Sequence, residues 1–423
     1  MRRFLLECIL VLVTSFYFFD FTMPFLPPSI NTKILVGIFG ILAFVSDSIR
    51  KHEMSFSTPM IFATLLAFIF SVWCLFCVTV NNSFSPHSTE YTKYFISFAT
   101  WMAGAYGVCA ALRWKYEEVT LEVLVRYLAW AGVFQCVMAL LIDNVGAVER
   151  FVDKIMYQPG NYYKIHNRMY GLGAALDPAG VRFSVILILI AQQLSDNEHV
   201  RTDRRQQSFY LAAFVLIFVV GSVISRTTGV GAVMGVGYLA ISMIRLHRGG
   251  LIPMNVFRAF FRFILILVLI VFGVIYLYHT NDTFHGYLRF GLEGFFNWVE
   301  TGEFRTSSTD ILVQQMWIWP EDVRTWLIGR GSFGIFENPT DIGYCNFTLY
   351  CGAIGLFIFS VYLIYCHLIQ NRKLQNFKIA SWLFVILTFV IWIKVTTDIF
   401  FIDALLFWIA GDKLAENEIA EPR

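Results

Sequence analysis

Residues 59–80 read PMIFATLLAFIFSVWCLFCVTV, an apolar run of 22 residues without a charged side chain. A helix rises about 1.5 Å per residue, so a run of this length can cross the roughly 30 Å of hydrocarbon in a bilayer. Similar runs recur along almost the whole chain, in which 57% of the 423 residues are apolar and 15% are charged. The sequence therefore predicts an all-α polytopic membrane protein with no stretch left for a separate soluble domain.

The apolar runs predict about twelve membrane spans. Lys and Arg residues gather in alternate connections, as at Arg50-Lys51 and Arg372-Lys373. The positive-inside rule places those connections, and with an even number of spans both termini, on the cytoplasmic side of the membrane. The expected spans are 4–22, 34–47, 59–80, 93–112, 120–142, 177–194, 208–224, 227–244, 260–278, 345–369, 378–395 and 397–411.

Two long connections, 143–176 and 279–344, are expected on the outer side. They divide the chain into five expected parts: 1–142 with five spans, the loop 143–176, 177–278 with four spans, the larger loop 279–344, and 345–423 with three spans and a polar tail. The predicted cytoplasmic connections are short, apart from 245–259. Function is therefore expected on the outer side, where the long loops are.

Charge and cysteine usage exclude several classes of function. The net charge of +2 is too small to indicate a nucleic-acid partner. The 8 cysteines lie inside spans or at their ends, as small apolar residues do. Cys74 and Cys77 have a CxxC spacing but no second pair or histidine in a matching position. We therefore expect no metal, no cofactor and no disulfide framework.

Arg226 is the most informative single residue. It interrupts the small, apolar stretch GSVISRTTGVGAVMGVG at Gly221–Gly237. An unpaired arginine near hydrocarbon costs about 2.5–3.5 kcal/mol or more, so such a residue is usually kept for an ion pair or a ligand. A chain reversal at Thr227 and Thr228 would place the guanidinium at the outer membrane surface. We expect Arg226 to bind substrate phosphate, with a structural ion pair as the alternative.

Three further arginines, Arg168, Arg289 and Arg305, lie in the predicted outer loops, against the positive-inside rule. Guanidinium groups bind phosphate oxygens in pairs, so these residues are candidates for binding an anionic substrate together with Arg226. In the alternative interpretation they only pair with loop acids and solvate the loops. The acids available are Glu149, Asp153, Glu293, Glu300, Glu303 and Glu321.

A second informative stretch, LIGRGSFGIFENPTDIGYCNFTLYCGAIGL, runs from Leu327 to Leu356. Gly329, Gly331 and Gly334 would let the backbone approach a ligand closely, although no nucleotide-loop Lys-Ser/Thr follows them. Asp341 stands where the outer loop meets the next span. It is a candidate base for an acceptor hydroxyl, or alternatively the N-cap of the following helix.

The order of these motifs along the chain is similar to that in a known protein family. They are Arg168 with Gly171, Ser225-Arg226-Thr227, Arg305, Gly329-x-Gly331, Asp341-x-Gly343-Tyr344 and Gly352-x-x-Gly355. This arrangement over about 168–360 resembles the bacterial O-antigen polymerase and ligase family. The resemblance implies a GT-C-like membrane glycosyltransferase that moves glycan from undecaprenyl diphosphate to a sugar hydroxyl on the periplasmic side, without a nucleotide sugar or a required metal.

The resemblance also indicates which member of the family to expect. Ligases, which transfer glycan to lipid A core, tend to carry His-Asn where this chain has Thr340-Asp341. This departure favours a polymerase of lipopolysaccharide O-antigen or capsule repeat units. The same departure leaves the identity of the catalytic base undecided, because His166 and His285 are candidates beside Asp341. A chain-length regulator and a flippase are the expected protein partners, beside membrane lipids and the lipid-linked donor and acceptor.

Aromatic side chains of the outer loops could stack on sugar rings, with an interfacial aromatic belt as the alternative. They are Trp298, Trp317, Trp319, Trp326, Tyr287 and Tyr344. A flippase or transporter of lipid-linked sugars is the second function that the sequence leaves open. Against it stand the lack of an evident internal repeat and the scarcity of ionisable residues in mid-span.

Overall fold

The structure of the chain is a computed structural model. It describes residues 2–54, 56–85, 89–157, 163, 168–248, 293–303, 305–332 and 340–411, with single residues at 261, 265, 272, 289 and 291. These residues form helices and their connections, and extended pairing among them is limited to one isolated bridge between Thr22 and Asn31. The all-α fold class is confirmed. His166, His285, Tyr287, Gly334 and most of the expected span at 260–278 lie outside the described residues.

The chain forms two compact units, each built from two separate stretches of sequence. Unit 1 comprises Met1–Thr32 and Val119–Arg305, and unit 2 comprises Lys33–Glu118 and Thr306–Arg423. Neither unit is continuous, so a division along the chain does not separate them. Each unit is described by itself below.

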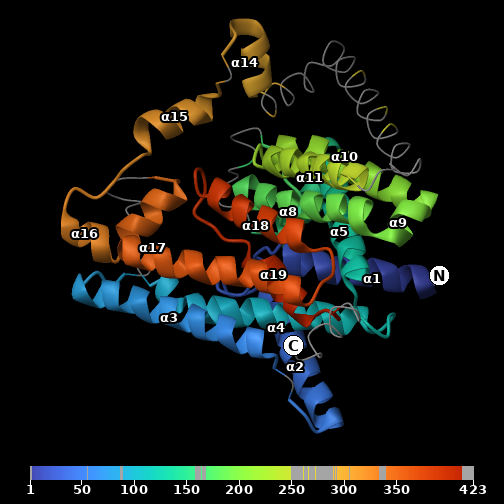
Figure 1. Ribbon diagram of the computed structural model, residues 1–423, viewed down its shortest axis with the longest axis horizontal. Coiled ribbons are helices and arrows are strands. Elements are labelled where there is room, and N and C mark those ends of the chain that lie inside the picture. The colour runs from blue at the N-terminus through green and yellow to red at the C-terminus, as the bar shows by residue number, and fades with distance from the viewer. Residues whose placement is uncertain are drawn as a thin grey trace. The chain divides into compact units, whose positions relative to one another are not determined.

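Helix α8 is the centre of unit 1. It packs against α5, α10 and α11, and its residues from Ala179 to Ser195 are buried apart from Arg182. A helix that is apolar on all sides is stable only when neighbours surround it. The helices among the described residues of this unit are α1 (Arg2–Phe18), α5 (Leu121–Asn144), α6 (Gly146–Ile155), α8 (Leu176–Asp196), α9 (Glu198–Thr202), α10 (Arg204–Ile224), α11 (Thr228–Arg248) and α14 (Glu293–Thr301) (Figure 1).

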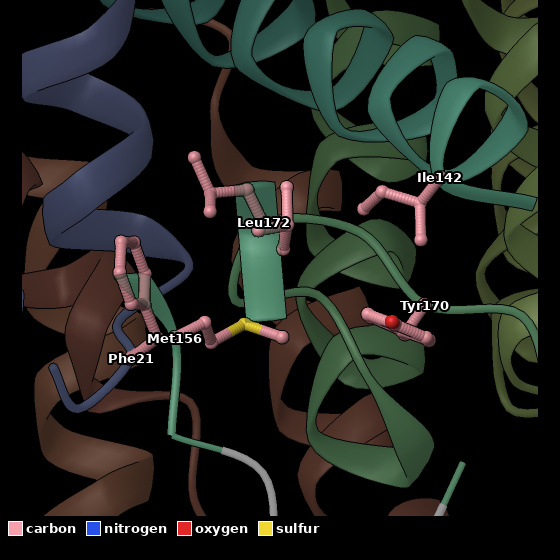
Figure 2. Packing of buried hydrophobic residues seen from close by; sticks show 6 residues of the cluster. Phe21, Ile142, Met156, Tyr170 and Leu172 are labelled. Atoms are coloured by element: carbon pink, nitrogen blue, oxygen red, sulfur yellow. The ribbon is translucent and has the colours of Figure 1, made fainter. Parts of the chain in front are cut away.

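An apolar cluster fixes the connection between α5 and α8, the first of the predicted outer loops. Phe21, Ile142, Met156, Tyr170 and Leu172 point toward one another in it (Figure 2), and Val152 completes it. These side chains come from the end of α5, from α6 and its end, from the segment after α1 and from the segment before α8. The segment that leads into α8 is therefore held by a core of its own.

Unit 2 is arranged around the long helix α17. Helix α3 packs against both α4 and α17, and α19 packs against α4 (Figure 1). The helices of this unit are α2 (Thr32–Lys51, whose first residue is assigned to unit 1), α3 (Thr58–Val80), η1 (Tyr91–Lys93), α4 (Tyr94–Leu112), α15 (Ser307–Gln315), α16 (Val323–Ile328), α17 (Gly343–Ile369), η3 (Gln370–Arg372), α18 (Lys378–Ile391) and α19 (Phe400–Trp408).

Helix α17 is broken at Gly352, which has φ 69° and ψ 177°. Backbone beside the break is bonded by the segment after α16, since Arg330 N donates to Leu349 O at 2.7 Å and Gly331 N donates to Tyr350 O at 2.9 Å. The indole of Trp73 in α3 donates to Cys351 O at 2.9 Å. Irregular backbone inside an apolar helix is tolerated only when other protein groups satisfy it, and here two segments do so.

Among the described residues, seven helices are long and apolar enough to cross a membrane, as expected of a multi-pass membrane protein. They are Thr32–Lys51, Thr58–Val80, Tyr91–Leu112, Leu121–Asn144, Leu176–Asp196, Arg204–Ile224 and Gly343–Arg372. Helix α1 has 17 residues, and the apolar helices Thr228–Ile244 and Lys378–Ile391 are also shorter. Where a span was expected at 397–411, α19 has only 9 residues. The count of twelve spans stays a prediction.

The break in α17 gives a first testable prediction. A Cβ at Gly352 would lie 2.1 Å from Leu327 O, and the positive φ disfavours any L side chain. We expect Gly352→Ala to lower the apparent melting temperature in detergent by several degrees, as a loss of about 2 kcal/mol or more would. Gly237→Ala in α11 is the control, because a Cβ there meets nothing within 4 Å. Equal melting of the two variants would contradict the packing at Gly352.

Candidate functional site

The residues Ser225–Thr227, here called the Arg226 turn, connect α10 to α11. Asp177, near the start of α8, contacts the residues on either side of Arg226. Its Oδ1 accepts hydrogen bonds from Ser225 Oγ at 3.0 Å and from Thr227 Oγ1 at 2.9 Å. Two hydroxyls on one carboxylate fix the backbone on either side of Arg226, so the position of this arginine is set by the scaffold.

Asp177 is itself positioned by the segment that follows Arg168. Gly173 has φ 89°, and a Cβ there would lie 2.2 Å from Phe19 O. The buried amide of Gln135 in α5 donates to Leu172 O at 2.7 Å. The glycine is thus required for a close approach to the end of α1, and the segment enters α8 in one defined conformation.

Close packing of α8 and α11 holds the other side of the Arg226 turn. A Cβ at Gly231 would lie 2.1 Å from Ser184 Cα, so only glycine allows this approach. Ser184 Oγ donates to Thr227 O at 2.9 Å and accepts from Gly231 N at 3.2 Å. Gly231, one of the small residues noted in the sequence after Arg226, therefore serves helix packing, as expected for apolar helices in contact.

Arg226 forms an ion pair with Glu293 of α14, with Nη2 and Oε2 2.6 Å apart. The two side chains are 18% and 21% exposed, respectively. Burial lowers the pKa of Arg226, and the carboxylate of Glu293 partly offsets this effect. The positive charge of Arg168 lowers the pKa of Arg226 further, so these two arginines lie within electrostatic range of each other. Two of the predicted substrate-binding residues are therefore brought together.

The other two predicted arginines pair with acids of their own segment. Arg289 makes a two-pronged contact to Glu300, with N–O distances of 2.6 and 2.7 Å, and this contact lowers the pKa of Glu300. Arg305 lies 3.1 Å from Glu303, and both side chains are more than half exposed. Exposed pairs of this kind contribute little to stability. Arg226, Arg289 and Arg305 thus each form an ion pair with an acid of the second outer loop, and a role in substrate binding stays a prediction.

The two arginines and two acids of this cluster carry no net charge together. The carboxylate of Glu293 is paired with the guanidinium of Arg226, and that of Asp177 accepts hydrogen bonds from the hydroxyls on either side of it. A phosphate that binds here must therefore displace or share Glu293. Exchange is feasible because guanidinium binds carboxylate and phosphate oxygens with the same geometry. The ion pair keeps a half-buried cation ordered when no ligand is bound.

Gly329 and Gly331 lie in unit 2, and their close backbone approach is to protein. A Cβ at Gly329 would lie 2.3 Å from Tyr350 O, and one at Gly331 would lie 2.7 Å from Val78 Cα. Both have positive φ values, 67° and 68°. These glycines join α17 to α3. Whether they also contact a ligand stays a prediction.

Asp341 is exposed and precedes α17, whose N-cap is Ile342, without a side-chain cap. The alternative in which Asp341 caps this helix is therefore wrong; the hydroxyl of Thr340 accepts from Ile342 N at 3.1 Å instead. Tyr344 OH donates to Phe389 O at 2.8 Å, which ties it to α18. A catalytic role for Asp341 and a substrate contact for Tyr344 stay predictions.

Three of the predicted sugar-stacking aromatics gather in unit 2. The rings of Trp319 and Trp326 are stacked with centroids 5.4 Å apart, and Trp317 lies 5.8 Å from Trp319. All three are about 40% exposed. They form an exposed aromatic surface between α15 and α16, which suits either a sugar face or a membrane interface.

A buried polar group in unit 2 was not predicted. His367 Nδ1 of α17 lies 2.8 Å from Asp403 Oδ2 of α19, and both side chains are 0% exposed. His367 Nε2 lies 2.9 Å from Thr388 Oγ1 of α18. An acid in the apolar run FFIDALLFW was a readable signal, because ionisable residues in such runs are kept for a partner or a function. The same holds in unit 1 for Arg182 and Asp20, which form a partly buried ion pair.

The candidate residues are divided between the two units. Arg168, Arg226, Arg289 and Arg305 belong to unit 1, and Gly329, Gly331, Asp341 and Tyr344 belong to unit 2. Among the described residues there is no group of three His, Cys, Asp or Glu side chains suited to a metal ion.

No protein-family model matches this chain, nor does any curated protein or any solved structure. The chemistry of the site therefore depends on the residues described above.

The contacts of Asp177 give a second testable prediction. Asp177→Asn keeps the size of the side chain but removes the charge that accepts both hydroxyls, so we expect a loss of about 1–3 kcal/mol. Thermal unfolding in detergent measures this loss as a lower melting temperature. Glu118→Gln, at an exposed position outside the site, controls for the loss of one negative charge. Equal melting of the two variants would show that the Arg226 turn does not depend on Asp177.

Proposed function

We propose that this chain polymerises undecaprenyl-diphosphate-linked oligosaccharide repeat units into O-antigen or capsular polysaccharide, by glycosyl transfer on the periplasmic side of the inner membrane. The observation that supports this most is Arg226 on a turn that Asp177 fixes between α10 and α11, with Arg168 within electrostatic range of it. The proposal places both termini in the cytoplasm and includes the GT-C-like architecture that the resemblance implies.

The chemistry of the donor fits these residues. A diphosphate is a dianionic leaving group, and two guanidinium groups can bind its oxygens in pairs while staying charged at physiological pH. Contacts that strengthen as the leaving group gains charge accelerate the reaction, whereas uniform binding does not. In the proposed cycle the diphosphate replaces Glu293 as the partner of Arg226, with Arg289 and Arg305 contributing at the periphery.

The acceptor is the terminal sugar of a second lipid-linked unit, whose hydroxyl attacks the anomeric carbon of the donor. Asp341 is proposed to take or orient the hydroxyl proton, because it is an exposed carboxylate at the start of α17. The growing chain passes to the new carrier, and undecaprenyl diphosphate departs. The reaction needs no energy source beyond the donor linkage, no metal and no cofactor. A flippase would supply the substrate, and a chain-length regulator would limit the product.

A flippase or transporter of lipid-linked sugars is the second candidate function. Two observations in unit 2 favour it: the break in α17 at Gly352 and the buried pair of His367 with Asp403. Broken helices and buried ionisable residues are common in carriers. A ligase that transfers finished glycan to lipid A core is a third outcome of the same test.

The first test compares the lipid-linked and surface glycans of a strain lacking this protein with those of the complemented strain. Single repeat units on the outer face, without a ladder of longer chains, are expected of a missing polymerase. Long lipid-linked polymer that stays untransferred would show a ligase. Single units retained on the cytoplasmic face would show a flippase and contradict the proposed mechanism.

The role of Arg226 gives a third prediction. Arg226→Ala should reduce polymer about 10²–10³-fold while the protein still inserts, as expected for loss of one group that stabilises a developing charge. Arg226→Lys should rescue poorly, because lysine lacks the two-pronged contact. Arg204→Ala, at the exposed first residue of α10, is the control. Gel ladders of surface glycan, normalised to protein in the membrane, measure the effect.

The structural alternative for Arg226 is tested by Glu293→Gln. If Arg226 serves only the ion pair, then Arg226→Ala and Glu293→Gln should lower polymerisation by the same factor. If Arg226 binds the donor, Glu293→Gln should keep much more polymerisation than Arg226→Ala. Normal polymer from both Arg226 variants would rule out the diphosphate role.

Asp341 gives a fourth prediction. Because its side chain does not cap α17, Asp341→Asn should leave the melting temperature within about 1 °C of that of the parent protein while lowering polymerisation. A melting scan and a glycan ladder of the same preparation separate these effects. Full activity of Asp341→Asn would exclude this residue as the base.

A further inference from the structure

Unit 2 contains an apolar pocket that the proposed reaction does not use. Its volume is about 250 Å³, and it is enclosed by α2, α3 and α4 with Phe56 and Trp408. The two hydroxyls in its wall are already bonded, Thr64 Oγ1 to Met60 O at 2.7 Å and Tyr106 OH to Asp47 Oδ2 at 2.5 Å. These hydroxyls therefore need no hydrogen bond from a ligand, and the pocket can bind a hydrocarbon chain.

The pocket arises from the way α2 meets α4. A Cβ at Gly40 would lie 1.9 Å from Ala103 O, and one at Gly107 would lie 2.5 Å from Val36 O, so the two backbones touch there. Toward Lys51, helix α2 diverges from α3 and α4 (Figure 1). Large apolar side chains along α2, including Ile41 and Leu42, are at least half exposed. A pocket between helices that cross at one point and then separate is open to the acyl chains of a membrane.

A cationic group lies at one end of this pocket. Tyr106 is part of the wall, and the guanidinium of Arg113 lies 4.9 Å from its ring centroid. Arg113 Nη1 contacts Asp47 Oδ2 at 3.0 Å and Tyr106 OH at 3.4 Å. Both contacts use Nη1, so among the described residues the donors of Nη2 and Nε are left for a further acceptor. Arg50 and Lys51 in the last turn of α2 add positive charge to this end.

We propose that this pocket is a lipid site, in which one acyl chain of an anionic phospholipid fills the pocket and its head-group phosphate contacts Arg113. An apolar pocket open to hydrocarbon and ending at a half-exposed arginine matches the two parts of such a molecule. Asp47 does not repel the phosphate strongly, because Tyr106 and Arg113 already compensate its charge. The site shares no residue with those assigned to donor and acceptor, and it does not depend on the proposed function.

The test measures lipid binding to the full-length protein in detergent by native mass spectrometry. Phosphatidylglycerol and phosphatidylcholine with identical acyl chains are the probes. The parent protein should bind one phosphatidylglycerol about tenfold more tightly than phosphatidylcholine, because the choline ammonium of phosphatidylcholine neutralises the phosphate charge that attracts Arg113. Ala99→Phe, which fills the pocket, should weaken both lipids about tenfold. Ile96→Phe adds similar bulk at an exposed position of α4 outside the pocket, and should change neither.

The head-group contact is tested by Arg113→Gln, which should lower phosphatidylglycerol binding to the level of phosphatidylcholine. Unchanged phosphatidylcholine binding by this variant shows that the pocket is still folded. Lys378→Gln, an exposed residue at the start of α18, is the control and should keep the preference. Equal lipid binding by Ala99→Phe and Ile96→Phe would overturn the proposal that the acyl chain lies in this pocket. A preference that survives Arg113→Gln would overturn the head-group contact. Tighter binding of undecaprenyl phosphate than of phosphatidylglycerol at the same site would overturn the phospholipid as occupant.

Discussion

Satisfying polar groups inside an apolar environment is the constraint on which both units depend. In unit 1 the carboxylate of Asp177 accepts two hydroxyls, and Glu293 compensates the charge of Arg226. In unit 2 the break at Gly352 is closed by amides of the segment after α16 and by the indole of Trp73. A buried polar group without a partner costs several kcal/mol, roughly as much as the net stability of a small domain. Each contact therefore determines which helices must be neighbours.

Most helices could be predicted from the sequence, because uniform apolar runs decide them without reference to distant contacts. The expected runs at 59–80 and 208–224 correspond to α3 and α10, within a few residues at each end. The end of the chain was less predictable, since α19 is a short helix. Its apolar sequence resembles that of a span, and only the helices packed against it define where it starts and stops. The two discontinuous units were not predictable either, because hydropathy says nothing about which helices pair.

The site could be predicted in part. Arg226 stood out because a charge in an apolar stretch must be compensated, and the acids that pair with Arg226, Arg289 and Arg305 were all among the alternatives. The pairing itself was not readable, since several acids of each loop were equivalent in sequence. Asp177 was missed because an acid before a proline at a helix start is ordinary. Gly329 and Gly331 were expected to allow close approach of the backbone to a ligand. The structure shows such a close approach, to the backbone of α17 and α3.

The break in α17 has a consequence for how the chain is made. Helix α3 and the break that it helps to satisfy are far apart in sequence, as the hydrogen bond from Trp73 to Cys351, 278 residues away, shows. During synthesis α3 enters the membrane long before its partner exists. Until α17 exists, the indole of Trp73 cannot form this hydrogen bond. The polar contacts at the break in unit 2 therefore form only after α17 has been made.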